Sequence, residues 1–228
     1  TDYHYFASVL MIHFSRLCTD LITWNTQEFA FIVLPDEFCT GSSMMPQKKN
    51  PDVLEISRGK TGQVIGHLID LLITLKGLPM TYNRDLQEDK RGLWASLDTV
   101  ESTVKIISDL LEKVEVDEKA ALAGLEKGYS LATDIAEYLV LKGVPFREAH
   151  LKVGRLTAWC IENNLSFNDL TFEQWQKHIP EADEEIMKIL SPRESVNRRN
   201  TYGGTGFEQV KKQLEIRRGT TATYRSSG

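Results

Sequence analysis

The sequence predicts an all-α protein, with a long up-and-down helical bundle followed by a smaller helical domain. Apolar residues recur with a helical period through almost all of the 228 residues, and no stretch alternates convincingly as a strand. Three periodic stretches in the first half are long enough for bundle helices, whereas those after about residue 116 are shorter and have clear stop signals. We therefore expect domains at 1–116 and 117–218, with a flexible polar tail at 219–228.

Three long helices account for the first domain. The first is expected over about residues 2–30 and the third over about 85–113. The second is expected over about 51–75, because Pro51 suits the first helical position and Asn50 is a good capping residue.

Three glycines form a stripe along the second of these helices. Gly59, Gly62 and Gly66 are spaced by three and four residues, and each costs about 1 kcal/mol of helix stability relative to alanine. Close approach of a neighbouring helix would offset that cost. Glu55 lies one turn earlier on the same stripe, so we expect it to face a crowded helix contact rather than water.

The second domain is expected to contain shorter helices with recognisable ends. They cover residues 131–142 and 147–162, the turns opened by the capping boxes at Thr171 and Ser191, and an amphipathic helix from a glycine-rich loop to about Arg217.

Composition excludes several classes of protein. A net charge of −5 argues against a nucleic-acid-binding face, and no apolar run approaches the length of a membrane span. Three widely spaced cysteines indicate reduced thiols in a cytoplasmic protein and have no metal-ligand spacing. The chain starts without Met, directly in a helical pattern, so we expect it to begin inside a larger protein.

The chemistry is concentrated in residues 41–52, Gly-Ser-Ser-Met-Met-Pro-Gln-Lys-Lys-Asn-Pro-Asp. The prolines at 46 and 51 favour an extended segment between them, so Lys48 and Asn50 should share one side and Lys49 should face the other. A cation, an amide and a helix N-terminus then favour an anion at the same place. A phosphate-binding loop is excluded, because Gln47 and Lys49 replace its glycine and hydroxyl residues.

This pattern, Gly-Ser-Ser-x-Met-Pro-x-Lys-x-Asn, resembles the signature of the fumarase/aspartase superfamily of all-helical lyases. Other segments resemble its argininosuccinate lyase branch: residues 78–90, 131–135, 142–150 and 202–205. The resemblance covers about residues 2–217, which would be the C-terminal half of such an enzyme.

The resemblance implies cleavage of argininosuccinate to arginine and fumarate by anti elimination, within arginine biosynthesis and without cofactor or metal. Ser42 would be the base that removes the proton beside a carboxylate. Lys48 and Asn50 would stabilise the resulting dianion, and Glu55 would orient a catalytic histidine.

The block at 78–90 is implied to bind substrate through Tyr82, Gln87 and Lys90, with Lys90 facing a carboxylate. The family also implies a homotetramer whose sites combine residues from three subunits. Neither nucleic acid nor membrane is an expected partner.

The catalytic histidine of the family has no counterpart in this sequence. Its five histidines all lie outside the family's histidine motif: His4, His13, His67, His150 and His178. We therefore expect the isolated chain to be inactive. The alternatives are a sibling lyase acting on adenylosuccinate, fumarate or aspartate, a non-catalytic crystallin of the same fold, and a truncated helical assembly module.

Overall fold

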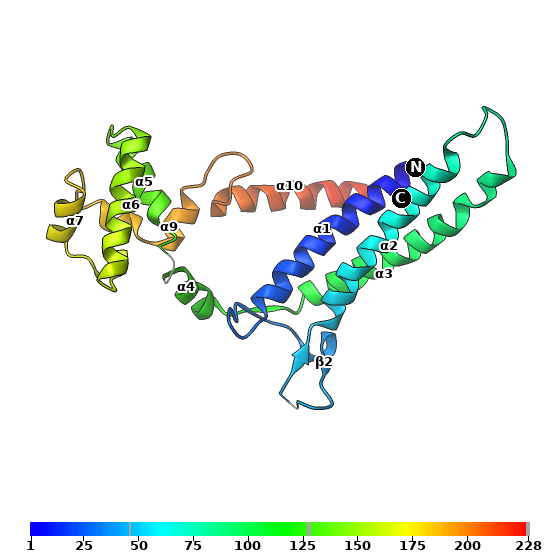
Figure 1. The fold of residues 1–228 in the computed structure, drawn as a ribbon, viewed down its shortest axis with the longest axis horizontal. Helices are drawn as coiled ribbons and strands as arrows, with labels where there is room; N and C mark the ends of the chain where they lie inside the picture. Colours follow the sequence, from blue (N-terminus) through cyan, green and yellow to red (C-terminus); the bar gives the residue numbers. More distant parts are fainter. Residues whose placement is uncertain (46, 127–128, 227–228) are drawn as a thin grey trace. The chain divides into compact units, whose positions relative to one another are not determined.

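The computed structural model describes residues 1–45, 47–126 and 129–226 of the chain, so Pro46 of the serine loop lies outside the described part. The chain forms two compact units, Thr1–Ala121 and Leu122–Gly228. Helices dominate both units (Figure 1), which confirms the all-α prediction.

Three long helices lie side by side in the first unit and alternate in direction (Figure 1). They are α1 (Asp2–Trp24), α2 (Asp52–Leu75) and α3 (Asp89–Leu111), with a 3-10 turn at Arg84–Gln87 before the third. Met11, Val64 and Val100, one from each helix, are buried together. Leu54 and Ile107 belong to a second buried cluster. The predicted helices are therefore present, with shorter ends than expected.

Two short strands lie where the sequence predicted none. β1 (Ile32–Val33) pairs antiparallel with β4 (Glu115–Val116), with Ile32 opposite Val116. The prediction of no strand was wrong here, because a two-residue strand is too short to alternate detectably and its partner is distant in sequence. This pairing ties the segment after α1 to the segment after α3.

A second strand pair carries the serine loop. β2 (Thr40–Gly41) pairs antiparallel with β3 (Lys49–Asn50), with Thr40 opposite Asn50 and Gly41 opposite Lys49. The expectation that Asn50 caps α2 was wrong: Asn50 is in the strand, Pro51 is the N-cap residue, and its cap has no side-chain hydrogen bond. Because Asn50 pairs with Thr40 in the strand pair, it is not at the N-cap position of α2.

The glycine stripe of α2 is not covered within this chain. An added Cβ at Gly59, Gly62 or Gly66 would meet no atom within 4 Å, and Glu55 is exposed. The expectation of a crowded contact was therefore wrong for the single chain. The buried residues of α2 are on another face of the helix, which packs in the bundle: Leu54, Ser57, Thr61, Val64 and Leu71.

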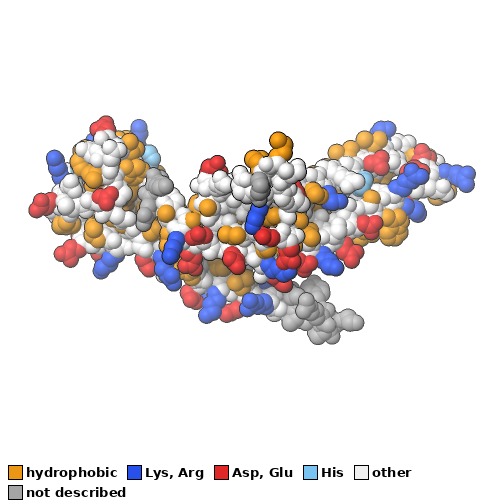
Figure 2. Space-filling model, turned by 90° about the horizontal axis from the view of Figure 1, so that it is seen from below, with side chains coloured by type: hydrophobic (Ala, Val, Ile, Leu, Met, Phe, Trp, Pro, Cys, Tyr) orange, Lys and Arg blue, Asp and Glu red, His pale blue; other side chains and the backbone are white. Residues whose placement is uncertain are grey.

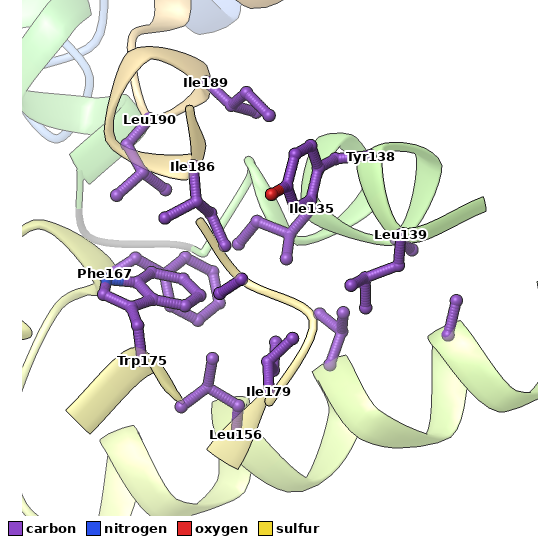
Figure 3. Close-up of a cluster of buried hydrophobic side chains, with 14 of the residues drawn as sticks. Ile135, Tyr138, Leu139, Leu156, Phe167, Trp175, Ile179, Ile186, Ile189 and Leu190 are labelled. Carbon is purple, nitrogen blue, oxygen red and sulfur yellow. The ribbon is translucent and has the colours of Figure 1, made fainter. Parts of the chain in front are cut away.

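The second unit is helical, and its residues 135–190 supply one apolar core (Figure 3). Its helices are α5 (Ala132–Leu141), α6 (Phe146–Glu162), α7 (Phe172–His178), α8 (Ile186–Ile189), α9 (Pro192–Asn197) and α10 (Phe207–Ser226), with a 3-10 turn at Phe167–Asp169. The capping box Thr171–Gln174 is present in full. At Ser191, the side chain accepts from the backbone N–H of Glu194 at 3.5 Å.

Two helices of this half differ from the sequence-based picture. α4 (Glu118–Glu126), at the junction of the two units along the chain, was not expected. α10 includes most of the stretch 219–228 for which a tail was predicted, and residues 227–228 lie outside the described part.

One helix has the length and apolar composition of a membrane span. Among the described residues, only α1 qualifies, and 28% of its apolar 18-residue stretch is buried. Core helices also pass this test, and α1 contributes Ala7, Met11, Cys18 and Leu21 to the bundle core. On the face seen in Figure 2, acidic and basic side chains are interspersed without a continuous basic patch.

Candidate active site

Ser42 is the first residue after β2, in the loop that joins the two short strands. Its Oγ accepts hydrogen bonds from the backbone N–H groups of Met44 and Met45, each at 3.2 Å. Two donors directed at one hydroxyl oxygen favour its deprotonated form, since hydrogen bonds to a charged group stabilise that group. The loop geometry is thus suited to holding this serine in its deprotonated form.

Lys48 is the last residue before β3, so Ser42 and Lys48 flank the paired positions of the hairpin. The backbone N–H of Lys48 donates to the carbonyl of Met45 at 3.0 Å, which closes the loop on itself. Ser42 therefore follows one strand of the pair directly, and Lys48 directly precedes the other.

Three of the predicted site residues line one groove of about 600 Å³: Lys48, Asn50 and Glu55. Met45 and Gln47, from the serine loop, line it as well. The volume is within the usual range for small-molecule sites. A cation, an amide and a carboxylate thus meet in a space large enough for a small molecule.

Lys49 also lines the groove, but its ammonium group is paired with Asp36. This hydrogen bond to a carboxylate raises the pKa of Lys49 above its usual range. On the same hairpin, the hydroxyl of Thr40 donates to the carboxylate of Asp52 at the start of α2. Of the two adjacent lysines, Lys49 therefore has an ion-pair partner on its own unit, whereas Lys48 has none among the described residues.

The groove includes residues that sequence reasoning missed. Asn25, Thr26, Gln27 and Glu28 line it from the turn after α1. They were assigned to the first helix, which was expected to reach residue 30. Their run of polar residues after Trp24 was the available signal for an earlier helix end.

The second predicted block lies elsewhere in the unit. Tyr82, Gln87 and Lys90 are near the connection between α2 and α3, at the opposite end of these helices from the serine loop (Figure 1). The 24 residues of α2 separate the two regions by about 36 Å, at 1.5 Å per residue. One copy of the chain cannot bring the two groups of residues to one ligand.

Within that block the polar side chains interact with one another. The amide of Gln87 donates to the hydroxyl of Tyr82 at 3.4 Å, and Lys90 pairs with Asp89 at 2.8 Å. All except Asp89 are exposed, so they form a polar surface at the end of the helical hairpin.

Among the described residues, no histidine lines the groove. His67 is paired with the hydroxyl of Ser96 at 2.9 Å, and His4 is buried with its Nε2 unpartnered. Both lie on the bundle helices rather than in the serine loop, so the described residues of this unit supply no histidine to the groove.

Comparison with known proteins gives a match in each half of the chain. The family model described as "Argininosuccinate lyase C-terminal" matches residues 129–197, and the one described as "Lyase" matches residues 1–66. The argininosuccinate lyase of Listeria monocytogenes serotype 4b (strain CLIP80459) is 47% identical over 209 residues, 92% of this chain and 46% of the relative. The argininosuccinate lyase of Syntrophus aciditrophicus is 49% identical over 213 residues, which cover 93% of this chain and 45% of the relative. The chain thus spans about half the length of the curated relatives it matches.

Solved structures share the fold. EDDS lyase in complex with formate has a TM-score of 0.85 at 23% identity, covering 98% of this chain and 46% of that one. A class II fumarase from Schistosoma mansoni has a TM-score of 0.60 at 17% identity, and the match covers 81% of this chain and 38% of the fumarase. At these identities the likeness establishes the arrangement of helices alone.

Proposed function

The chain belongs to the fumarase/aspartase superfamily and matches its argininosuccinate lyase branch, and from that premise we propose that it supplies the serine loop of an enzyme that cleaves argininosuccinate to arginine and fumarate. The observation that carries the proposal is the groove lined by Lys48, Asn50 and Glu55. Ser42 is not in its lining, but Met45, whose backbone N–H donates to the Oγ of Ser42, is.

The proposed reaction begins at the carbon beside a carboxylate of the substrate. The Oγ of Ser42 takes the proton from that carbon, and the electron pair of the C–H bond moves into the carboxylate. The resulting dianion is stabilised by Lys48 and Asn50, which act as fixed donors worth a few kcal/mol each in such sites. The pair then forms the double bond of fumarate as the C–N bond breaks. The electron pair of the C–N bond stays on the leaving nitrogen, which takes a proton from a general acid that another segment provides and departs as arginine.

Ser42 needs help to act as a base, because a free hydroxyl is almost never deprotonated at neutral pH. The N–H groups of Met44 and Met45 stabilise the deprotonated oxygen, and the charge of Lys48 acts in the same direction. Water exclusion when the loop closes over substrate would strengthen both effects.

Glu55 is assigned the orientation of a histidine that another segment provides. Its exposure at the groove leaves the carboxylate accessible to such a partner. Tyr82, Gln87 and Lys90 are assigned to substrate binding in a site completed by another copy, since they lie about 36 Å from the serine loop of their own copy.

We propose a homotetramer with shared sites, in the cytoplasm. The bare glycine stripe of α2 favours assembly, and so do the large apolar side chains exposed on the same helix: Ile56, Ile69, Leu72 and Ile73. Sedimentation equilibrium of the purified chain should give a mass four times that of the monomer. A stable monomer would contradict this assembly.

The decisive experiment measures fumarate release by ultraviolet absorbance. The chain alone should release none, and the chain joined to the N-terminal half of a curated relative should be active. In the joined protein, Ser42→Ala should lower kcat by about 10²–10⁴-fold, the usual effect of removing a general base. Ser43→Ala is the matched control and should leave activity within about tenfold. Near-normal turnover by Ser42→Ala would refute Ser42 as the base.

Two alternatives have their own discriminating results. Faster turnover of adenylosuccinate than argininosuccinate by the joined protein would favour a sibling lyase. Stable tetramers of the joined protein without turnover of either substrate would favour a non-catalytic, crystallin-like role.

A further inference from the structure

The second unit contains a pocket that the proposed lyase reaction does not use. It has a volume of about 630 Å³ and lies among α5, α8 and α9. Its lining combines an apolar surface with two cations and two carboxylates. Surface pockets of this size with a few convergent polar groups are the usual form of a small-molecule site.

The apolar surface comes from Tyr138, Leu141 and Ile189. Tyr138 and Ile189 are only 4% and 8% exposed and belong to the core cluster of the unit (Figure 3). The hydroxyl of Tyr138 donates to Asp183 at 2.7 Å, and Lys142 pairs with the same carboxylate at 2.5 Å. These two donors lower the pKa of Asp183 to about 2, so the carboxylate stays charged and holds the ring of Tyr138 in place.

The cations are Arg198 and Lys188. Arg198 donates to the carbonyl of Ile189 at 3.4 Å, and its guanidinium lies 3.7 Å from the buried carboxylate of Asp134. Asp134 also accepts from Ser195 at 2.8 Å, which connects α5 to α9. Arg198 is therefore fixed at the pocket, whereas Lys188 has no ion-pair partner among the described residues.

The carboxylates are Glu185 and Glu194. The carboxylate of Glu185 lies 3.3 Å from the ammonium group of Lys142, a residue that does not line the pocket. The side chain of Glu185 remains 64% exposed. Glu194 has no ion pair in the part of the chain that the structure describes. The pocket thus presents both signs of charge beside an apolar surface, and one charge of each sign has no ion pair within the described ranges.

We propose that this pocket binds a free α-amino acid with an aliphatic side chain. The ligand carboxylate pairs with Arg198 and Lys188, the ligand ammonium group pairs with Glu194 and Glu185, and the side chain packs on Leu141 and Ile189. A ligand of about ten heavy atoms in an open site of this kind binds with a Kd on the order of 1 mM. This site is independent of the serine loop and of the proposed reaction.

The test is an NMR titration of the purified chain with three probes of matched shape. L-leucine carries both charges, 4-methylpentanoate lacks the ammonium group, and 3-methylbutylamine lacks the carboxylate. We expect saturable shifts of the Leu141 and Ile189 methyl signals with L-leucine, and at least about fivefold weaker binding of the other two, since each lacks one charge-assisted hydrogen bond. Equal binding of all three would reduce the pocket to an apolar surface and overturn the proposal.

Variants then test the charges. Lys188→Met and Glu194→Gln should each weaken L-leucine binding by about fivefold or more. Lys177→Met on α7, outside the pocket, should leave it unchanged. Circular dichroism checks that each variant is folded. No shifts with about 20 mM L-leucine, far above the expected Kd, would overturn the proposal, and so would equal binding by the two pocket variants and the control.

Discussion

The backbone N–H of Met45 donates a hydrogen bond of 3.2 Å to the Oγ of Ser42, three residues earlier in the chain. The same oxygen accepts from Met44 at 3.2 Å, so the loop stabilises a charge on the residue that is proposed to carry it. Because this geometry lies within one short segment, it can be tested without a complete active site.

Ser42→Ala removes the acceptor for both N–H groups. The amide hydrogens of Met44 and Met45 should then exchange with solvent several times faster, because hydrogen bonding protects them. Hydrogen exchange followed by NMR checks this, with Ser43→Ala as the control that leaves both rates unchanged. Identical rates in the two variants would show that the Ser42 hydroxyl does not hold the loop.

The two adjacent lysines should differ strongly in function. In the joined, active protein, Lys48→Met should lower kcat by about 10²–10³-fold, the cost of losing one fixed donor to a developing anion. Lys49→Met should cost less than about tenfold, because Lys49 is paired with Asp36. Steady-state measurement of kcat and KM for both variants checks this. Equal losses of kcat in the two variants would show that the ion pair of Lys49 with Asp36 does not make the two lysines differ in function.

Acid should destabilise the first unit through His4. Burial lowers the pKa of His4 below its ordinary value of 6.5, and the positive charges of the N-terminus and His67 lower it further, while Asp89 opposes them. The unfolded chain binds a proton below pH 6.5 that the folded bundle binds only at lower pH. Stability is therefore full above about 6.5 and declines as the pH falls toward the folded pKa.

Thermal unfolding at several pH values, with His4→Leu as the variant, checks that decline. The variant should lose the part of the pH dependence that lies below 6.5, since leucine does not titrate. His13→Gln on the exposed side of α1 should keep it. An unchanged pH profile in His4→Leu would assign the acid sensitivity to other groups.

The core of the second unit gives a stability prediction with a control on the same helix. Leu156 is fully buried on α6, and Leu156→Ala should lower the free energy of unfolding by about 2–5 kcal/mol through lost burial and a cavity. Leu151 on the same helix is 52% exposed, and Leu151→Ala should cost less than about 1 kcal/mol. Urea unfolding of both variants checks this. Similar costs would contradict the assigned burial.

Much of the fold could be predicted because helical periodicity is a local property. The sequence predicted the long helices of the first unit, the α5 and α6 segments and the capping box at Thr171, since each depends on residues a few positions apart. The same reasoning failed for β1 and β4, whose two-residue pairing joins Ile32 to a residue 84 positions later, Val116.

For the site, the sequence by itself identified the candidate residues of the serine loop. Ser42, Lys48 and Asn50 all lie in one continuous segment, so their proposed chemistry could be inferred from local sequence. Only the tertiary structure decided that Lys49 pairs with Asp36, that the turn at Asn25 lines the groove, and that Tyr82 lies at the far end of α2. These facts depend on the lengths and packing of three helices. The physical reason is that a rigid helix of about 36 Å fixes which residues of one chain can meet at one ligand and which cannot.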